Sequence, residues 1–250
     1  MPYNAAVELR GKVALVTGAG QRIGRAIALA LGRAGASVIV HYNKSADEAD
    51  ATAEQVRALG VKAEAIQADL TETGQIKAMF ATVGERLGRL DVLVNNASTF
   101  YPTPLKELTE ENWDELLTVN AKAPTFCIQA AAELMRAGGG GCIINITDIS
   151  AERPWRTFVA YCASKAALAA VTVSAAKALA ADGIRVNAVA PGVIAPPPGA
   201  TPESVARLIK PVPLGRKGDP EDVAAAVVFL AANDYITGQT INVDGGKSVT

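Results

Sequence analysis

The sequence predicts an α/β protein of the doubly wound type: a parallel sheet of about seven strands with helices on both faces, formed by one domain over residues 1–250. Short apolar runs rich in Val and Ile alternate with longer Ala-rich runs along the whole chain. Strands that are apolar throughout are typical of parallel strands buried on both faces. No internal repeat and no low-complexity linker interrupts this alternation.

The strands are expected where β-branched and apolar residues cluster over short stretches, at residues 13–18, 37–42, 62–70, 90–97, 141–147, 184–191 and 240–246. The longer runs between them predict helices at residues 22–33, 46–59, 75–87 and 158–181. Gly35 and Gly60 follow the first two helices, at the position where glycine commonly ends a helix. The four glycines at residues 138–141 predict a turn from a helix into a strand.

Residues 191–204 are too rich in Pro and Gly for a helix or a strand. They follow an expected strand directly, and ligands of open parallel sheets bind beyond the carboxyl ends of the strands. We therefore expect a substrate loop at about residues 191–215. The alternative is an ordinary stiff surface connection.

Charge and cysteine content exclude several classes of protein. The 24 Lys and Arg residues balance 25 Asp and Glu, without a basic block, which argues against nucleic acid as a partner. Polar residues interrupt the apolar stretch at 166–181, and the opening residues lack the pattern of a secretory signal, so no membrane association is expected. Cys127, Cys142 and Cys162 lie isolated among apolar residues, which predicts buried thiols, a reducing cytoplasmic location and no metal site.

The first expected strand leads into a glycine-containing loop, Thr17 to Gly24, and then into a helix. Small residues let the backbone approach a pyrophosphate, and the free N–H groups at a helix start favour its negative charge. Such a loop alone could be a simple turn. Its place between a strand and a helix is what a dinucleotide site requires, so the prediction becomes a Rossmann-type fold.

The second expected strand ends in the sequence His41-Tyr42-Asn43-Lys44-Ser45. NAD-binding proteins usually offer an acidic residue to the ribose at this point. A cation among several hydrogen-bonding side chains suits a 2′-phosphate better, so NADPH or NADP+ is the predicted cofactor. The alternative, which is compatible with the first, is that Ser45 caps the next helix and Lys44 is solvated.

Tyr161 and Lys165 are four residues apart at the start of the long Ala-rich helix, so they share one face. An ammonium beside a phenol favours the phenolate, which predicts a Tyr161 pKa lowered towards the range useful for proton transfer to a carbonyl or imine. The alternative is ordinary packing of a common pair.

Four motifs occur in the order T-G-x-x-x-x-x-G (17–24), N-N-A-S (95–98), V-N (119–120) and Y-x-x-x-K (161–165). Together they resemble the short-chain dehydrogenase/reductase family, and the resemblance covers residues 12–246. It implies that Tyr161 is a proton donor, that Lys165 binds the nicotinamide ribose and tunes Tyr161, and that Asn120 holds a water in a proton relay.

The resemblance also implies contacts of the cofactor with residues that follow the strands. These are Gly18, Arg22, Ile23, Tyr42, Asn43, Lys44, Ser45, Asp69, Leu70, Asn96, Ala97, Tyr161, Lys165, Pro191, Gly192 and Ile194. Within this set Asp69 would contact adenine, and Asn96 would lie beside the adenosine side.

Three departures from the family pattern are informative. Asp148 stands thirteen residues before Tyr161, where members usually have Ser. Arg22 replaces a glycine of the first loop, and Phe100 offers an aromatic face that could stack on a flat heterocycle. With these features the chain looks like the pteridine reductase branch of the family.

That branch implies NADPH-dependent reduction of a dihydropterin or dihydrofolate. The ring would lie between Phe100 and the nicotinamide, with Ser98 and Arg22 holding its polar edge. Asp148 and Tyr161 would deliver the proton to a ring nitrogen, since a carboxyl group can bind the N–H and amino groups of a pterin directly. A homotetramer is the usual assembly.

Several alternatives remain open on the sequence. Asp148 could form an Asx-type turn, with Thr147 or Ser150 as the helper hydroxyl of a carbonyl reductase such as a 3-oxoacyl-acyl-carrier-protein reductase. Phe100 could be loop packing. A nucleotide-sensing protein without turnover is a third class, although a proton donor at Tyr161 would serve no purpose in it.

Overall fold

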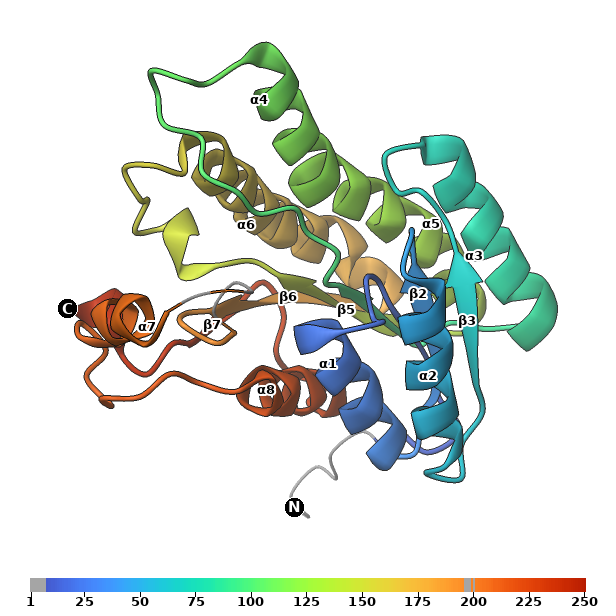
Figure 1. The fold of residues 1–250 in the computed structure, drawn as a ribbon. Helices are drawn as coiled ribbons and strands as arrows, with labels where there is room; N and C mark the ends of the chain where they lie inside the picture. Colours follow the sequence, from blue (N-terminus) through green and yellow to red (C-terminus); the bar gives the residue numbers. More distant parts are fainter. Residues whose placement is uncertain (1–7, 196–198, 200) are drawn as a thin grey trace.

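The computed structural model describes residues 8–195, 199 and 201–250 (Figure 1). Within them, seven strands form one sheet: β1 (Val13–Val16), β2 (Ser37–Tyr42), β3 (Ala63–Gln67), β4 (Val92–Asn95), β5 (Gly141–Ile146), β6 (Ile184–Pro191) and β7 (Thr240–Val243). The strand order is β3-β2-β1-β4-β5-β6-β7, and every neighbouring pair is parallel. This confirms the predicted α/β fold with a doubly wound parallel sheet.

The helices cover both faces of this sheet (Figure 1). One face carries α1 (Arg22–Arg33), α2 (Ala46–Arg57) and α8 (Pro220–Ala232). The other face carries α3 (Thr73–Leu87), α5 (Ala123–Ala137) and α6 (Val159–Leu179), and α4 (Glu110–Leu117) leads into α5. The short helix α7 (Pro202–Ile209) lies beyond the end of β7 (Figure 1).

Successive residues of the strands pack into opposite layers. Val16 and Val40 belong to the apolar layer under α1 and α8, whereas Leu15 and Ile39 belong to the layer under α3 and α5. All four are buried. Because both faces of each central strand are covered, the strands must be apolar throughout, which is the pattern that predicted them.

The boundaries differ from the expectation mainly at the carboxyl ends of strands. The fourth strand was expected over 90–97 but β4 ends at Asn95, and the third ends at Gln67 instead of residue 70. The polar residues beyond these ends leave the ladder and turn into loops. By contrast, α1, β2 and β6 have the expected bounds.

The segment expected as a loop at 191–204 is partly helical, which corrects that prediction. Helix α7 begins at Pro202, a residue that is favourable in a first helical turn. The Thr201 hydroxyl accepts the N–H of Ser204 at 3.3 Å and caps the helix. Residues 196–198 and 200 of this segment lie outside the described residues.

Among the described residues, one helix, Val159–Asp182, has the length and hydropathy of a membrane span. It is mostly α6, and it buries Tyr161, Ser164 and Lys165. These polar groups hydrogen-bond to β5 and to neighbouring segments, so we interpret α6 as a core helix of the α/β fold.

The sheet reverses its winding between β1 and β4. The chain leaves β1 to the helices of one face and leaves β4 to the helices of the other. In open parallel sheets this switch point opens a crevice at the carboxyl ends of the strands, where ligands bind. The loops after these two strands are therefore expected to carry the site.

Gly24 gives a test of how tightly these loops pack. A Cβ at Gly24 would overlap the carbonyl oxygen of Gly18 and lie 2.5 Å from Nδ2 of Asn96. We expect Gly24→Ala to lower the free energy of unfolding by about 1–3 kcal/mol in urea titrations, because the loop must move.

Gly74 in the first turn of α3 is the matched control, since a Cβ there meets no atom within 4 Å. Gly74→Ala should leave stability unchanged or raise it by up to about 1 kcal/mol. Equal stabilities of the two variants would contradict the close packing inferred at Gly24.

Candidate active site

Hydrogen bonds join the loop after β1 to the end of β4. The Thr17 hydroxyl oxygen accepts the N–H groups of Asn96 at 2.9 Å and Ala97 at 3.0 Å. The side-chain amide of Asn96 donates to the carbonyl oxygens of Thr17 at 2.9 Å and Gly18 at 3.0 Å. Asn96, predicted beside the cofactor, thus shapes the loop with its side chain. Thr17 has the same function and was not among the predicted site residues, although the T-G motif contains it.

The start of α1 is free for an anion. Gln21 occupies the N-cap position without a side-chain cap, and the first turn holds no acidic residue. Unpaired N–H groups and the helix dipole at such an end favour a phosphate. Ile23, predicted to contact the cofactor, lies half-buried in this turn.

Arg22 has an unusual backbone at this point. Its φ is +53°, and within the described residues it is the one non-glycine residue with a positive φ. Its guanidinium donates to the carbonyl oxygen of Ala195 at 2.5 Å, just after β6. Arg22 therefore connects the loop after β1 to the segment after β6 that contains Gly192 and the buried Ile194. A strained backbone held by a long-range contact is common at functional sites.

The ends of β2 and β3 lie beside each other. Asn43 and Lys44 are exposed, and Ser45 takes the N-cap position of α2 without a side-chain cap bond. The alternative is therefore correct in part: Ser45 lies at the N-cap and Lys44 is solvated, but the Ser45 hydroxyl makes no capping bond and is available for another partner. Hydrogen bonds from Thr71 lower the pKa of Asp69, and the charge of nearby Lys44 adds to this effect.

A carboxyl, a phenol and an ammonium meet between β5 and α6. The Tyr161 hydroxyl donates to Oδ2 of Asp148 at 3.0 Å, and the N–H of Ser150 donates to Oδ1 at 2.7 Å. The second contact is the Asx-type turn considered for Asp148, so the turn and the contact with Tyr161 occur together. Burial raises the pKa of Asp148 despite these hydrogen bonds.

Lys165 lies close to Tyr161, as its spacing predicted, but its ammonium hydrogen-bonds to β5. Its ammonium donates to the carbonyl oxygen of Ile146 at 3.0 Å and lies 5.7 Å from the centre of the Tyr161 ring. Burial and the charge of Asp148 raise the pKa of Tyr161 well above its usual value of 10. Burial also lowers the pKa of Lys165 to about 8. The expected lowering of the Tyr161 pKa is therefore wrong for this arrangement, in which Tyr161 is a protonated donor.

Asn120 lies in a five-residue π-helical segment, Thr118–Lys122, between α4 and α5. Its side-chain oxygen accepts the hydroxyl of Ser98 at 3.0 Å and the N–H of Thr99 at 2.9 Å. Its side-chain nitrogen donates to the Thr99 carbonyl at 2.9 Å and to the Ser164 hydroxyl at 3.1 Å. All four hydrogen-bonding positions of this amide are used, so the side chain ties the segment after β4 to α6, and the relay water at Asn120 stays a prediction. Irregular π segments of this kind are frequent at functional sites.

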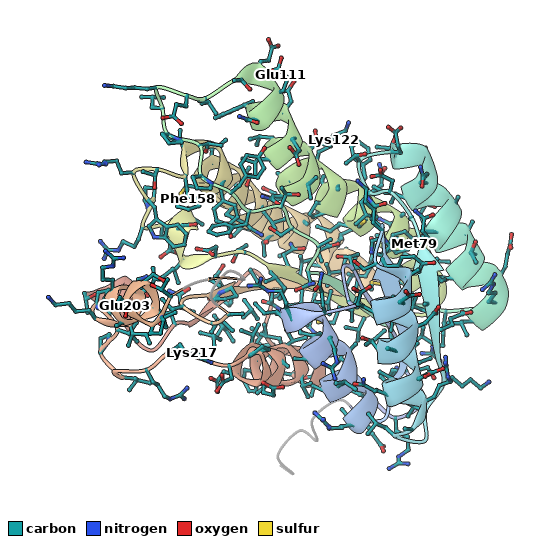
Figure 2. The ribbon with its side chains drawn as sticks, viewed as in Figure 1. Met79, Glu111, Lys122, Phe158, Glu203 and Lys217 are labelled. Carbon is teal, nitrogen blue, oxygen red and sulfur yellow. The ribbon has the colours of Figure 1, made fainter. Side chains whose placement is uncertain are left out.

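Four aromatic rings gather above Asp148. Phe100 stacks on Phe158 with ring centres 4.8 Å apart and meets the edge of Tyr161 at 4.7 Å. Trp155 stacks on Tyr161 at 6.3 Å. Phe158, labelled in Figure 2, directly precedes α6. The loop-packing alternative for Phe100 is thus correct in part, yet 49% of this side chain remains exposed and available to a ligand.

The C-terminal turn also contributes to this site, which the sequence did not predict. The Lys247 ammonium lies 5.8 Å from the centre of the Trp155 ring. Burial lowers the pKa of Lys247, against the raising effect of the charge of Asp148. Asp244 accepts the N–H of Ser248 at 2.6 Å, and Arg153 donates to the Ser248 carbonyl at 3.1 Å. Trp155 and Phe158 were likewise missed, although the short spacing of aromatics at 155–161 was a visible signal.

The candidate site therefore gathers nearly all the predicted residues at one edge of the sheet. Its chemistry combines an anion-binding helix start, a cation beside it, a partly buried carboxyl, a phenol donor and exposed aromatic surface. Among the described residues, no group of His, Cys, Asp and Glu side chains could hold a metal ion.

Comparisons with known proteins agree with this arrangement. The model of a family described as "Enoyl-(Acyl carrier protein) reductase" matches residues 18–248. The chain is 41% identical to the 3-oxoacyl-acyl-carrier-protein reductase FabG of Staphylococcus aureus, over 94% of this chain and 97% of that protein. It is also 41% identical to galactitol 2-dehydrogenase of Agrobacterium fabrum, over 96% and 99%.

Among solved structures, the angucycline C-6 ketoreductase LanV with bound NADP is 38% identical and covers 98% of each chain, with a TM-score of 0.90. The relatives thus share the whole length of the fold and differ in the substrates that their names give. From the matching motifs, the strand order and these likenesses, the chain belongs to the short-chain dehydrogenase/reductase family.

Proposed function

We propose that the protein is an NADPH-dependent pteridine reductase that reduces a dihydropterin or dihydrofolate. The observation that carries this proposal is the contact between the Asp148 carboxyl and the Tyr161 hydroxyl, 3.0 Å apart beneath an exposed aromatic ring. A carbonyl reductase needs neutral donors at this place to bind a ketone oxygen, whereas a carboxyl also accepts hydrogen bonds from N–H groups. Pterins present such groups along one edge.

The protonation states favour this assignment. Because burial raises the pKa of Asp148, its carboxyl takes up a proton more readily than a solvated one. Tyr161 retains its proton and donates a hydrogen bond to Asp148. In the proposed reaction these two groups pass a proton to a ring nitrogen, while the buried cation of Lys165 stabilises the negative charge left behind. Bound NADPH supplies the hydride.

The cofactor preference rests on the end of β2. Lys44 is exposed, and the hydroxyl of Ser45 has no capping bond, so both can meet a 2′-phosphate. The uncapped start of α1 suits the pyrophosphate. LanV was crystallised with NADP, which supports the same preference in a relative.

A carbonyl reductase of the 3-oxoacyl-acyl-carrier-protein type is the second candidate, favoured by the FabG relative. It would need a helper hydroxyl near Tyr161. The Thr147 hydroxyl, however, donates to the Val189 carbonyl at 3.1 Å and is buried. Ser150 is fully buried. Neither is presented to a ligand, so Asp148 remains the group beside Tyr161 and the pterin assignment is preferred.

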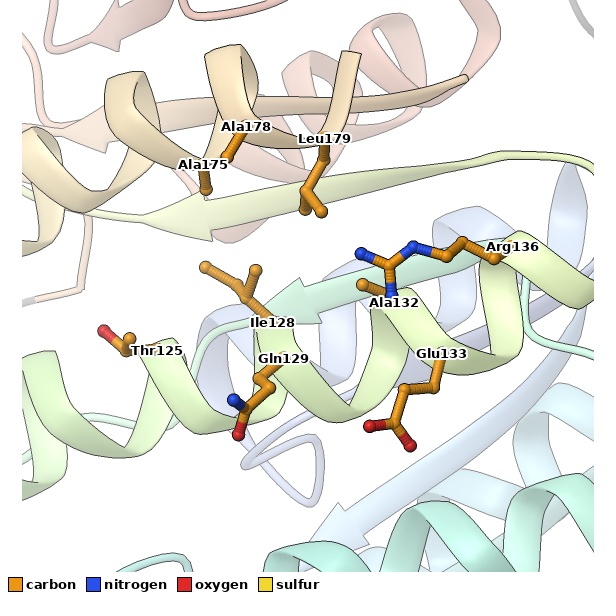
Figure 3. Close-up of a pocket in the computed structure, with 9 residues that line it drawn as sticks. All are labelled: Thr125, Ile128, Gln129, Ala132, Glu133, Arg136, Ala175, Ala178 and Leu179. Carbon is orange, nitrogen blue, oxygen red and sulfur yellow. The ribbon is translucent and has the colours of Figure 1, made fainter. Parts of the chain in front are cut away.

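We also propose a cytoplasmic homotetramer built through α5 and α6. A hollow of about 360 Å³ lies between these helices, lined by Ile128, Ala132 and Leu179 among others (Figure 3). Val173 on α6 is 41% exposed. The hollow is also lined by Thr125, Gln129, Glu133 and Arg136, and none of its lining residues belongs to the candidate active site, so this partly apolar surface is available to another subunit.

Substrate tests separate the two candidate activities. With NADPH, we expect turnover of dihydrobiopterin or dihydrofolate and much less of an acetoacetyl thioester. Asp148→Ser should lower kcat/KM for the pterin at least about 100-fold, since one charge-assisted contact in the transition state is lost with its proton. The measurement is the loss of NADPH absorbance.

Under the carbonyl reductase alternative, Asp148→Ser would leave ketone reduction unchanged or improve it. Asp148→Asn is the matched control for size. It should be as impaired as the Ser variant, because an amide cannot donate the same proton. Wild-type protein that reduces the thioester well and pterins not at all would refute the proposal.

Lys44→Asp tests the cofactor preference. We expect the variant to bind NADPH about 10-fold or more weakly, because an attractive charge becomes repulsive, and NADH with little change. Lys77→Asp in α3 changes the charge by the same amount at another exposed position and serves as the control. Equal affinities of the wild-type protein for NADH and NADPH in fluorescence titrations would exclude a 2′-phosphate site.

Ala178→Arg, in the hollow of Figure 3, tests the assembly. A buried unpaired charge at an interface costs several kcal/mol, so we expect smaller species in sedimentation velocity. Ala51→Arg on the exposed side of α2 is the control and should sediment like the wild type. A wild-type monomer at micromolar concentration would rule out the tetramer.

A further inference from the structure

His41 is the one histidine of the chain, and it lies buried at the end of β2. The N–H of Gly18 donates to its Nδ1 at 3.1 Å. Its Nε2 lies 3.0 Å from the carbonyl oxygen of Ala68. The N–H of Ala19 also donates to the backbone carbonyl of His41 at 2.9 Å. One residue therefore joins the loop after β1 to the end of β3.

These contacts determine the tautomer. A carbonyl oxygen can only accept, so Nε2 carries the proton and donates to Ala68. A backbone N–H can only donate, so Nδ1 is unprotonated and accepts from Gly18. Only the neutral ring with its proton on Nε2 satisfies both neighbours.

The backbone of Gly18 is closely packed and is held by hydrogen bonds on both sides. Its φ is +61°, and a Cβ on it would lie 3.0 Å from the Cα of Ala97. Its carbonyl oxygen accepts the side-chain amide of Asn96, so its two backbone polar groups are held from β2 and from β4. The loop is fixed in the shape that leaves the start of α1 open.

We propose that His41 is a positioning residue for the dinucleotide: its neutral ring holds Gly18 in place and so sets the affinity of the loop for the cofactor. This inference rests on the proposed cofactor binding. It adds that the residue acts without touching the cofactor and that its protonation state controls binding.

Protonation would reverse the contact with Gly18. An imidazolium carries protons on both nitrogens, so an N–H would face the N–H of Gly18. Burial lowers the pKa of His41 from 6.5 to about 4, against the raising effects of the hydrogen bond to the Ala68 carbonyl and of the charge of Asp69. The unfolded chain therefore binds this proton more tightly than the folded one. The folded loop should lose stability as the pH falls from 6.5 to about 4.

Two isosteric variants separate the two ring nitrogens. In His41→Asn the side-chain oxygen can take the place of Nδ1 and still accept from Gly18. In His41→Gln the side-chain amide can reach the place of Nε2 and donate to Ala68, but no acceptor remains for Gly18. We expect NADP+ to bind His41→Gln about 10-fold or more weakly than the wild type, the size of effect seen when a buried donor loses its partner. His41→Asn should stay within about threefold.

Further measurements distinguish a loss of cofactor affinity from a general loss of stability. The Gln variant should raise KM for NADPH while kcat at saturation is retained. Thermal unfolding measures the stability of each variant independently of cofactor affinity. NADH binding to the wild type should weaken as the pH falls below about 5, and the same titration of His41→Asn should stay flat. NADH is used because it lacks the titrating 2′-phosphate.

Nitrogen NMR of the single histidine tests the tautomer directly in the free protein, without any variant. We expect one unprotonated nitrogen, Nδ1, and one protonated nitrogen, Nε2, at pH 7. Protonated Nδ1, equal NADP+ affinities of the Asn and Gln variants, or pH-independent NADH binding by the wild type would each overturn the inference. If no nicotinamide cofactor binds the wild type, the proposed function fails, and the NMR result still decides the state of His41.

Discussion

The hydrogen bonds that join the ends of β1 and β4 are the constraint on which the site depends. The sheet reverses its winding between these strands, so the chain after β1 and the chain after β4 run to opposite faces of the sheet. The Thr17 hydroxyl accepts the N–H groups of Asn96 and Ala97, and the Asn96 side-chain amide donates to the carbonyl oxygens of Thr17 and Gly18. The carbonyl groups of Thr17 and Gly18 are occupied, whereas the first N–H groups of α1 have no partner within the helix and no side-chain cap. The loop therefore offers free N–H donors and few free carbonyl acceptors, which favours the binding of an anion.

The buried group of Asp148, Tyr161 and Lys165 opposes folding through the loss of solvation of its polar side chains. Placing Asp148, Tyr161 and Lys165 in a poorly solvated space disfavours the charged form of each, and all three pKa values move accordingly. An isolated charge in such surroundings costs several kcal/mol, so the groups persist only because each has a specific partner. Clusters of perturbed groups at the edge of a sheet are typical of active sites, where the proton must move with little change in solvation.

Sequence patterns predicted the fold well because its elements are regular. Helix α1 has the expected bounds since its apolar spacing and its flanking Gly residues agree. The pattern could not predict the Tyr161 pKa, because a four-residue spacing to Lys165 says nothing of burial or of the carboxyl that the Asx turn brings within 3.0 Å. It could not predict Lys247 either. That residue reaches the site through a C-terminal turn whose contacts with Arg153 and Trp155 leave no periodic signal.

The end of β2 shows how one strand serves two different requirements. His41 points inward, where its ring replaces a missing backbone partner for Gly18 and bridges to Ala68. Asn43 and Lys44, only two and three residues later, lie on the surface where a phosphate can reach them. Strand β2 ends at Tyr42, so His41 lies within the buried sheet, whereas Asn43 and Lys44 lie beyond it, where the chain turns to the surface. A substitution at the exposed positions leaves the contact between His41 and Gly18 intact, whereas a substitution at His41 that removes the acceptor for Gly18 frees the backbone of the loop itself.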